Sequence, residues 1–264
     1  MEKIEIISDS DDETSLDNIV TKQEIKKDKG KVKKGKETVK ECYNIDPSIV
    51  EIGVDEAGRG PLFGRVYTAA VVLPKGNGNG NGKDGENQLF NHSLMKDSKR
   101  FHSKTKIQSA AEYIKANAIA WSVTYSDEKL IDEINILQAT QQSMHNSIRG
   151  VINTLSSKPE NISEDKIILL IDGNYFNPIM VNNKPLDYIT IEGGDNKYSC
   201  IAAASILAKV ERDKYIYDLC QEHPELIVKY ALDSNKGYGA KKHIEGIKQF
   251  GITKWHRKSF RPCK

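Results

Sequence analysis

The stretch Ile49-Val-Glu-Ile-Gly-Val-Asp-Glu-Ala-Gly-Arg-Gly60 joins a short apolar run to two adjacent acids and a glycine-rich turn. Its first six residues, 49–54, predict a β-strand. Asp55 and Glu56 follow where open α/β sheets bind ligands, in the loops beyond the carboxyl ends of their strands. Neighbouring residues of a strand point to opposite faces. Both acids can therefore reach one site only if the strand has ended before them, which the following glycines allow.

Further apolar runs downstream of this stretch predict four more strands, and amphipathic runs predict four helices. The strands are expected at 67–73, 119–125, 166–171 and 188–191, and the helices at 103–117, 135–154, 199–220 and 241–250. Residues 166–171 are apolar almost throughout, as in a strand covered on both faces. Early strands followed by strands that alternate with helices predict the α/β class, with a mixed five-stranded sheet flanked by helices.

Two further acids lie at predicted strand ends. Asp172 follows the strand at 166–171, and Asp195 follows the strand at 188–191, just before the long helix. Each acid alone is typical of a turn or a helix cap. Together with Asp55 and Glu56 they form a cluster whose members repel one another, a cost that a hard divalent cation removes. Carboxylate oxygens select Mg²⁺ or Mn²⁺, and two such ions can assist hydrolysis of a phosphodiester.

Two segments of the 264-residue chain lack an ordered pattern. Residues 1–46 are first acidic and then lysine-rich, with few apolar residues, and we expect a disordered tail. Its lysine run at 31–36 is either a nuclear signal, a non-specific DNA arm or simply solvated. Residues 75–91 contain Gly-Asn repeats, which predict a flexible loop insertion. We therefore expect one catalytic domain at 47–264.

Composition narrows the function class. No apolar run approaches the roughly 18 residues that a membrane span needs. The four cysteines form no C-x-x-C pair and are widely scattered, which favours a reducing compartment. We expect a cytoplasmic protein, or a nuclear one if the chain is eukaryotic. The net charge is only +2, but residues 236–264 hold nine lysines or arginines against the single acid Glu245. Such a basic block indicates a polyanionic partner.

Five sequence blocks occur in one order along the chain. They are Gly53-Val-Asp-Glu-Ala-Gly-Arg-Gly-Pro-Leu62; Lys96-Asp-Ser-Lys99; Leu170-Ile-Asp-Gly173; Gly194-Asp195 followed by Ile201-Ala-Ala-Ala-Ser-Ile-Leu-Ala-Lys-Val-Glu-Arg-Asp213; and Asn235-Lys-Gly-Tyr-Gly239 with His243 and His256-Arg-Lys-Ser-Phe260. This set resembles the ribonuclease HII family, the type 2 ribonucleases H, over roughly residues 48–261. A match across five blocks is far more specific than any single glycine-rich loop.

The resemblance implies a ribonuclease H-like fold with a C-terminal helical extension. It also implies a metal-dependent endonuclease, a hydrolase that cleaves the RNA strand of RNA–DNA hybrids. Such an enzyme incises 5′ to single ribonucleotides embedded in duplex DNA, which supports removal of ribonucleotides in DNA repair and of RNA primers. We expect a monomer that acts on these nucleic acids and not on membranes.

The resemblance also assigns roles to individual residues. Asp55, Glu56, Asp172 and Asp195 would be the catalytic residues and would bind two Mg²⁺ or Mn²⁺ ions. The substrate would be bound by Gly58, Arg59, Gly60, Lys99, Lys209 and Tyr238. The Gly-Arg-Gly backbone would approach the ribose 2′-hydroxyl, the group that separates RNA from DNA. Tyr238 would stack on the sugar at the RNA–DNA junction, and the two lysines would contact phosphates.

Three alternatives stay open at this point. The sister enzyme ribonuclease HIII shares the fold, but usually has Lys in place of Arg59 and a folded N-terminal domain. The catalytic subunit of the eukaryotic heterotrimeric enzyme has a similar signature. A non-catalytic module that only binds hybrids would use the basic C-terminal block. Two residues depart from the family pattern: Arg65 stands where Pro is common, and Ala240 where Thr is common.

Overall fold

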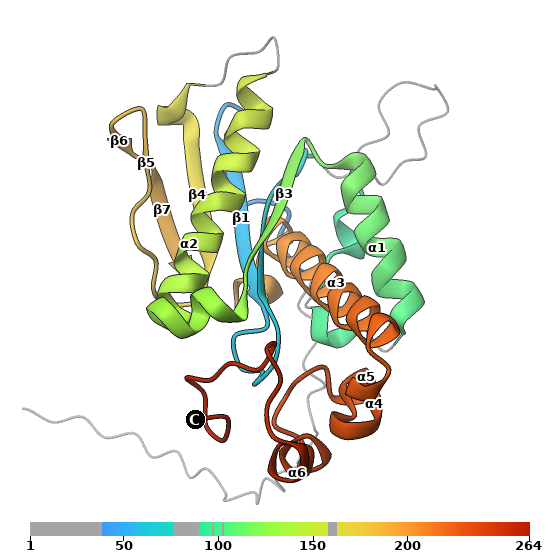
Figure 1. The fold of residues 1–264 in the computed structure, drawn as a ribbon. Coiled ribbons are helices and arrows are strands. Elements are labelled where there is room, and N and C mark those ends of the chain that lie inside the picture. Colours follow the sequence, from blue (N-terminus) through green and yellow to red (C-terminus); the bar gives the residue numbers. More distant parts are fainter. Residues whose placement is uncertain (1–38, 77–89, 97, 102, 158–162) are drawn as a thin grey trace, which may run out of the picture. The chain divides into compact units, whose positions relative to one another are not determined.

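The computed structural model describes residues 39–76, 90–96, 98–101, 103–157 and 163–264. A mixed sheet lies at its centre (Figure 1), with the strand order β3-β2-β1-β4-β7. Its strands are β1 (Val50–Ala57), β2 (Val66–Val72), β3 (Ala120–Ser126), β4 (Ile167–Asp172) and β7 (Asp187–Ile191). The short strands β5 (Met180–Val181) and β6 (Lys184–Pro185) form a separate hairpin.

The strand directions divide the sheet into two halves. β2 pairs antiparallel with β1 and with β3, whereas β4 pairs parallel with β1 and with β7. The carboxyl ends of β1, β4 and β7 therefore lie at the same edge of the sheet. The predicted mixed five-stranded sheet is confirmed.

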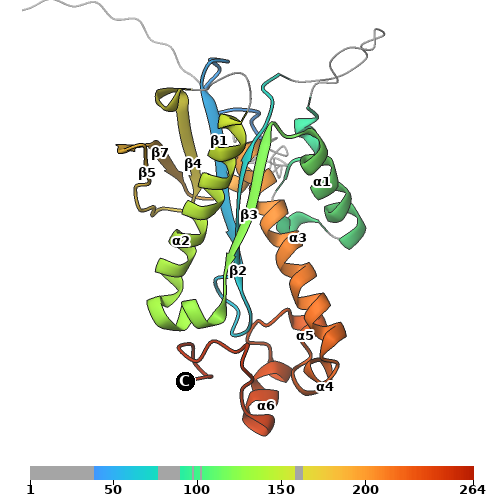
Figure 2. The ribbon, with the colours of Figure 1, turned by 45° about the horizontal axis from the view of Figure 1, so that its top comes forward.

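Helices cover both faces of the sheet. They are α1 (Lys104–Asn117), α2 (Glu128–Ser156), α3 (Ser199–Glu222), α4 (Glu225–Tyr230), α5 (Leu232–Asn235) and α6 (Lys241–Phe250). Figure 2 shows α2 on one face and α1 and α3 on the other. Side chains of β2 alternate between two apolar clusters: Ala69 and Val71 pack with α1 and α3, and Ala70 and Val72 pack with α2. The sheet is thus buried on both faces.

The first half of α3 approaches β1 very closely. The residues Ala202, Ala203 and Ala204 are fully buried there. A Cβ at Gly53 would lie 2.2 Å from the backbone carbonyl carbon of Cys200, so only glycine fits at this position of β1. This close packing holds the beginning of α3 against the strand that carries Asp55.

The C-terminal extension, made of α4, α5, α6 and the residues that follow, packs on the second half of α3 and on the loop between β1 and β2. Its apolar cluster includes Leu62 and Phe63 from that loop, Ile216 and Leu219 from α3, and Tyr230 from α4. The extension therefore lies at the edge of the sheet where β1 ends (Figure 1).

The structure changes three sequence predictions. β1 continues to Ala57, so the strand does not end before the two acids. α2 begins at Glu128, and the predicted start lies at a kink, because Asn135 has φ 68° and its side chain accepts a hydrogen bond from the Gln138 backbone. Helices α4 and α5 and the β5–β6 hairpin were not predicted, because they are too short for a clear apolar period.

Predictions for the chain ends and loops fall partly outside the described residues. These comprise most of the predicted tail at 1–46, the lysine run at 31–36, and residues 77–89 of the predicted loop insertion. The end of the predicted tail is described, and it contacts the domain: the backbone N–H of Lys40 donates to the carbonyl of Lys197, and that of Ser199 donates to the carbonyl of Lys40.

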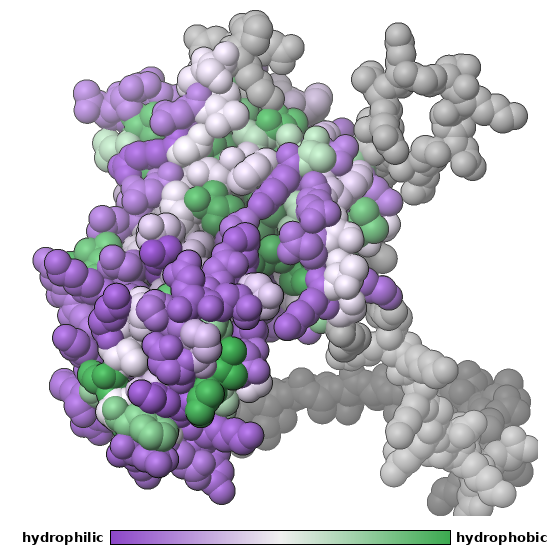
Figure 3. Space-filling view, turned by 45° about the vertical axis from the view of Figure 1, so that its right-hand side comes forward, coloured by the Kyte–Doolittle hydropathy of each residue, from purple (hydrophilic) through white to green (hydrophobic). Residues whose placement is uncertain are grey.

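The outer surface is mostly polar where the structure describes it. Figure 3 shows a largely hydrophilic face on which apolar patches are small and separate. None of the described helices is long and apolar enough to cross a membrane.

Candidate active site

Asp55 and Asp172 lie side by side at the ends of two neighbouring strands. Val54 of β1 is paired with Ile171 of β4, so the next residue of each strand is an aspartate. Val54 and Ile171 both pack in the α2 cluster. Since side chains alternate along a strand, the two aspartates point to the other face, towards α3. Asp55 is buried and Asp172 is partly exposed.

Glu56 reaches the same edge although it is still in β1. The pairing of β1 with β4 stops at Val54, whereas its pairing with β2 continues to Ala57. The last residues of β1 are therefore open on the β4 side. The charge of Asp172 raises the pKa of Glu56 and that of Lys99 lowers it, so both acids lie at one edge although the strand has not ended before them, contrary to the geometric expectation from sequence.

Asp195 lies in a 3-10 helix (Gly194–Asn196) that connects β7 to α3. Its backbone N–H and that of Gly194 donate to the Asp172 carboxylate, the latter over 2.6 Å to Oδ1. The Asp195 side chain is buried and accepts a hydrogen bond from the Asn196 amide at 3.0 Å. The segment after β7 thus contacts the carboxylate at the end of β4.

Three carboxyl groups at this edge have raised pKa values. Burial, followed by the charges of Glu56 and Asp172, raises the pKa of Asp55 well above its usual range. Burial raises the pKa of Glu56 against the opposing charge of Arg59, and Asp172 raises it further. Burial also raises the pKa of Asp172, although backbone N–H donors oppose it. Burial therefore disfavours the ionised form of all three carboxyl groups, and neighbouring carboxylates add to this at Asp55 and Glu56.

This donor set fits a hard divalent cation. Asp55, Glu56 and Asp172 offer only oxygen ligands, which Mg²⁺ and Mn²⁺ prefer. Within the described ranges no three His, Cys, Asp or Glu side chains are close enough to form a complete metal cage. A cation bound among the carboxylates would favour their ionised form, which burial disfavours.

Lys99 and Ser205 belong to the surroundings of the carboxylates. The Lys99 charge lowers the pKa values of both Glu56 and Asp172. Ser205 of α3 is hydrogen-bonded to Asp55, and its hydroxyl lies 3.0 Å from that of Ser98. The predicted phosphate-binding Lys99 therefore lies at the same edge as the carboxylates.

The predicted Gly58-Arg59-Gly60 segment continues directly from β1. Gly58 has φ 98°, and a Cβ there would lie 2.2 Å from Nε of the buried Arg212 of α3. The Arg59 guanidinium lies 3.3 Å from the Glu56 carboxylate. A Cβ at Gly60 would lie 3.7 Å from the ring of Tyr238. The segment therefore joins the carboxylate cluster to the predicted junction-binding tyrosine.

Tyr238 and Lys209 lie further from the carboxylates. Tyr238 is 50% exposed, and the Arg212 guanidinium lies 5.7 Å from its ring centroid. Lys209 of α3 is 2.5 Å from the Asp213 carboxylate. Burial lowers the pKa of Lys236, and the charges of Lys104 and Lys209 lower it further. These lysines form a basic region next to Tyr238, and in the part of the chain that the structure describes the ion pair of Lys209 is with Asp213 and not with the four acids.

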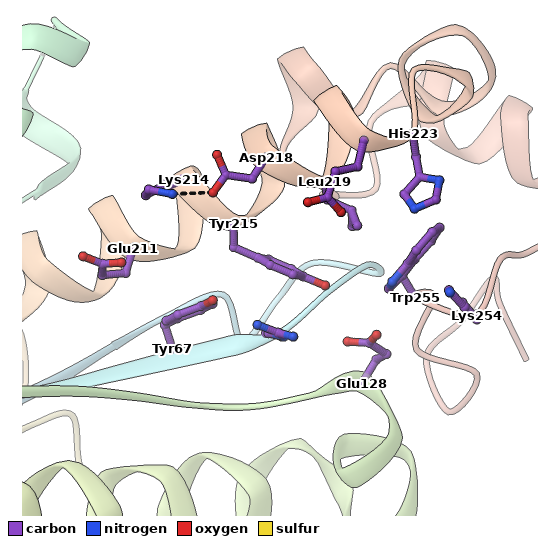
Figure 4. Close-up of a pocket in the computed structure, with 12 residues that line it drawn as sticks. Tyr67, Glu128, Glu211, Lys214, Tyr215, Asp218, Leu219, His223, Lys254 and Trp255 are labelled. Carbon is purple, nitrogen blue, oxygen red and sulfur yellow. Dashed lines mark hydrogen bonds and ion pairs between the residues drawn. The ribbon is translucent and has the colours of Figure 1, made fainter.

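A separate cavity of about 530 Å³ lies between β2, α3 and the C-terminal segment (Figure 4). None of the four predicted catalytic acids lines it. Its walls include Tyr67, Tyr215, Trp255 and Arg65. The Arg65 guanidinium lies over the rings of Tyr125 and Tyr215, at 4.0 and 4.5 Å from their centroids. These cation–π contacts accommodate an arginine where family members often have proline.

Two buried arginines near the site were not predicted. Arg212 donates to the backbone carbonyl of Lys236 at 2.8 Å, and Arg257 donates to four carbonyls of the loop after β1. Both are fully buried. The only sequence signal was their position inside two of the five family blocks, and nothing in the spacing indicated that they are buried.

Known proteins with similar sequences and folds identify the family of this chain. The family model described as Ribonuclease HII matches residues 52–263. A ribonuclease HII of Pelagibacter ubique is 42% identical over 210 residues, 80% of this chain and 95% of the relative. One from Bacteroides thetaiotaomicron is 39% identical, covering 82% and 92%. The crystal structure of ribonuclease H2 from Pyrococcus horikoshii has the same fold, with a TM-score of 0.54 at 23% identity, covering 81% and 95%.

Proposed function

The chain belongs to the ribonuclease HII family, and on this premise we propose that it incises duplex DNA on the 5′ side of single embedded ribonucleotides and hydrolyses the RNA strand of RNA–DNA hybrids. Membership of this family makes it a metal-dependent endoribonuclease with ribonuclease H activity. One observation carries the proposal: Asp55 and Asp172 each follow a residue of the paired register of two neighbouring parallel strands, and the charge of Asp172 raises the pKa of Asp55.

The four acids Asp55, Glu56, Asp172 and Asp195 would hold two Mg²⁺ or Mn²⁺ ions, and these would supply activation of a water and charge stabilisation for a phosphodiester hydrolysis. The chain's own contribution is to orient these acids. Backbone N–H groups after β7 donate to Asp172, and the Ser205 side chain is hydrogen-bonded to Asp55. Such hydrogen bonds fix the direction of the carboxylate oxygens before the substrate binds.

Substrate binding would use the surface formed by Gly58, Arg59, Gly60 and Tyr238. The exposed backbone of Gly60 can approach a ribose 2′-hydroxyl, because no Cβ stands in the way, whereas the buried Gly58 lets the chain turn against Arg212. The half-exposed Tyr238 ring offers a flat surface for the next sugar. Lys99, Lys209 and the basic block at 236–264 would bind phosphates without reading sequence, so binding should weaken steeply with salt.

The deciding experiment uses a labelled DNA duplex that contains one ribonucleotide, beside an all-DNA control. The protein is added with Mg²⁺ and the products are separated on a sequencing gel. We expect one cut on the 5′ side of the ribonucleotide, leaving a 3′-hydroxyl on the preceding DNA, and no cut in the control. Cleavage of a long hybrid without the single cut would indicate ribonuclease HIII-like specificity and contradict the proposed roles of Arg59 and Tyr238.

Two other outcomes address the remaining alternatives. A protein that binds hybrid duplex in chelator but never cuts it in Mg²⁺ would be a non-catalytic binding module. A protein that cuts only after addition of other subunits would be the catalytic subunit of a heterotrimer. Cutting by a monodisperse monomer, checked by light scattering on the same preparation, excludes both.

A further inference from the structure

The loop between β1 and β2 is held by two segments of the C-terminal extension. The backbone N–H of Gly64 donates to the carbonyl of Trp255, and that of Arg257 donates to the carbonyl of Leu62, both within 2.9 Å. On the other side, the Leu62 N–H donates to the carbonyl of Gly237 at 2.8 Å. The loop that begins with the Gly-Arg-Gly segment therefore lies between residues 255–257 and the residue that precedes Tyr238.

The Arg257 side chain determines the shape of this loop. Its guanidinium and Nε donate to the backbone carbonyls of Gly58, Arg59, Pro61 and Gly64 at 2.7, 3.0, 2.8 and 2.8 Å. The side chain is fully buried, and burying a charge is costly unless its donors are satisfied. For stability alone, an apolar side chain of similar volume would often serve as well. The contacts thus point to a role in fixing the loop backbone.

The neighbouring His256 is connected to Tyr238 through a second histidine. The Thr253 backbone N–H donates to His256 Nδ1 at 2.9 Å, so the His256 proton is on Nε2. His256 Nε2 lies 3.1 Å from His243 Nε2, which must accept that proton. The His243 proton is then on Nδ1, which donates to the Tyr238 carbonyl at 2.8 Å. The chain of hydrogen bonds has one direction, from Thr253 to Tyr238.

Both imidazoles are kept neutral, which preserves this direction. The two rings are fully buried. Burial lowers the pKa of His243, and burial together with the neighbouring His243 lowers the pKa of His256 to about 3. The rings also pack edge-on against Phe63 of the loop and Tyr230 of α4. A neutral and tightly packed pair holds a fixed geometry over the whole physiological pH range.

We propose that His256 and Arg257 act together as positioning residues that fix the Gly-Arg-Gly loop relative to Tyr238, and so set the preference for a ribonucleotide at a junction with DNA. This inference rests on the proposed function, which places the ribose between these two elements. The two residues are adjacent in sequence, but their side chains bind different segments. Arg257 donates to carbonyls within residues 58–64. His256 is hydrogen-bonded to His243, which donates to the Tyr238 carbonyl. Three of the proposed catalytic acids, Asp55, Glu56 and Asp172, lie on strands of the sheet, and the hydrogen bonds described for them come from other residues than His256 and Arg257.

The test begins with Arg257→Lys, which keeps the charge but cannot donate to four carbonyls at once. We measure kcat/KM on a duplex with one ribonucleotide and on a long RNA–DNA hybrid, and thermal unfolding of each protein. We expect a loss of about 50-fold or more on the single ribonucleotide and of less than about fivefold on the hybrid. Arg149→Lys, the same change on the exposed side of α2, is the control and should alter neither rate.

A binding measurement separates positioning from general damage. In chelator, fluorescence anisotropy compares the affinity for the ribonucleotide duplex with that for the all-DNA duplex. We expect Arg257→Lys to lose most of the preference for the ribonucleotide duplex while keeping its affinity for DNA. A folded Arg257→Lys protein that loses both activities equally and keeps the binding preference would overturn the proposal for Arg257.

Two substitutions of His243 test the hydrogen-bond chain from His256 to Tyr238. They remain informative if Arg257→Lys fails to fold. Asn places an amide near the position of Nδ1 and can still donate to the Tyr238 carbonyl, whereas Gln places it near Nε2 and cannot. We expect His243→Asn to keep the preference for a single ribonucleotide and His243→Gln to reduce it about tenfold relative to hybrid cleavage. Equal behaviour of the two proteins would overturn the hydrogen-bond chain.

These results are distinguishable from failure of the proposed function itself. A wild-type protein that does not incise the single-ribonucleotide duplex contradicts the proposed function, and the inference on His256 and Arg257 falls with it. A wild-type protein that incises normally, with variants that lose both substrates in parallel, contradicts only the inference.

Discussion

The carboxylate cluster and the surface around Tyr238 are placed by different kinds of contact. Asp55 and Asp172 are neighbours because β1 and β4 pair in a fixed register. The Gly-Arg-Gly segment and Tyr238 are neighbours because Arg257, almost 200 residues later in the chain, binds the loop after β1. The reactive groups therefore depend on the sheet, whereas the proposed substrate contacts depend on the C-terminal extension.

The two regions also differ in their electrostatics. Burial raises the pKa values of Asp55, Glu56 and Asp172, and neighbouring carboxylates raise those of Asp55 and Glu56 further, so ionising these groups at neutral pH costs stability. The buried Arg257 donates four hydrogen bonds to loop carbonyls. Changes in the first region should therefore affect activity without loss of stability, and changes in the second should affect both stability and substrate preference.

The largest effect is expected for Asp172→Asn. The substitution removes a proposed metal ligand together with a charge that raises the pKa of Asp55. Cleavage of both substrates should fall by at least about 1,000-fold, while the melting temperature in chelator stays equal or rises. Gel assays and calorimetry on one preparation measure the two quantities. Turnover near that of the wild type would remove Asp172 from the mechanism.

Gly58→Ala should have the next largest effect, on stability and activity together. A side chain at φ 98° is strained by about 1–3 kcal/mol, and its Cβ would displace Arg212. We expect a lower melting temperature and a loss of about 100-fold on the single-ribonucleotide duplex. Gly251→Ala is the matched control: it has φ 76° with no atom within 4 Å of the added Cβ. It should lose stability but retain activity, and equal activity losses would refute the proposed role of the Gly58 backbone.

Tyr238→Ala tests substrate preference with little effect on the fold. The ring is half exposed, so the free energy of unfolding should change by less than about 1 kcal/mol. Incision at a single ribonucleotide should fall about tenfold more than cleavage of a long RNA tract. Tyr217→Ala, on the exposed side of α3, is a control of similar exposure and should leave the ratio of the two rates unchanged. Parallel losses on both substrates for Tyr238→Ala would argue against a role at the junction.

The smallest effect is a pH-dependent stabilisation by Mg²⁺. Folding raises the pKa values of Asp55, Glu56 and Asp172. Just above about pH 4 the folded protein therefore binds more protons than the unfolded chain. Its free energy of unfolding falls as the pH rises through the raised pKa values. Mg²⁺ requires the ionised carboxylates. We expect Mg²⁺ to raise the melting temperature by about a few degrees at pH 8 and to leave it unchanged at pH 5.

Calorimetry with and without Mg²⁺ at both pH values measures this difference. Asp172→Asn should lose most of the gain at pH 8, because one ligand and one repelling charge are missing. An equal gain at both pH values would mean that Mg²⁺ binds elsewhere on the protein.

Much of the fold could be predicted because its signals are local. The five strands of the sheet and the helices α1, α3 and α6 follow apolar periods that are visible in short windows. The predicted start of α2 was wrong because residues 128–134 pack Ile131 against Val66 in a small separate cluster. Helices α4 and α5 are held by tertiary contacts such as those of Tyr230 and Leu232, which no short window contains.

The candidate site also has one part that local sequence signals predict and one part that they do not. An acid after an apolar run marks a strand end in the sequence, and parallel pairing then requires such ends to meet at one edge, so Asp55 and Asp172 could be predicted as neighbours. That Glu56 reaches this edge from within β1 depends on where the pairing with β4 stops. That Arg257 is buried beneath the Gly-Arg-Gly loop depends on how the extension folds back. The reactive groups could thus be predicted from local strand periodicity. The contacts that hold the proposed substrate surface could not, because their hydrogen bonds join residues far apart in the chain.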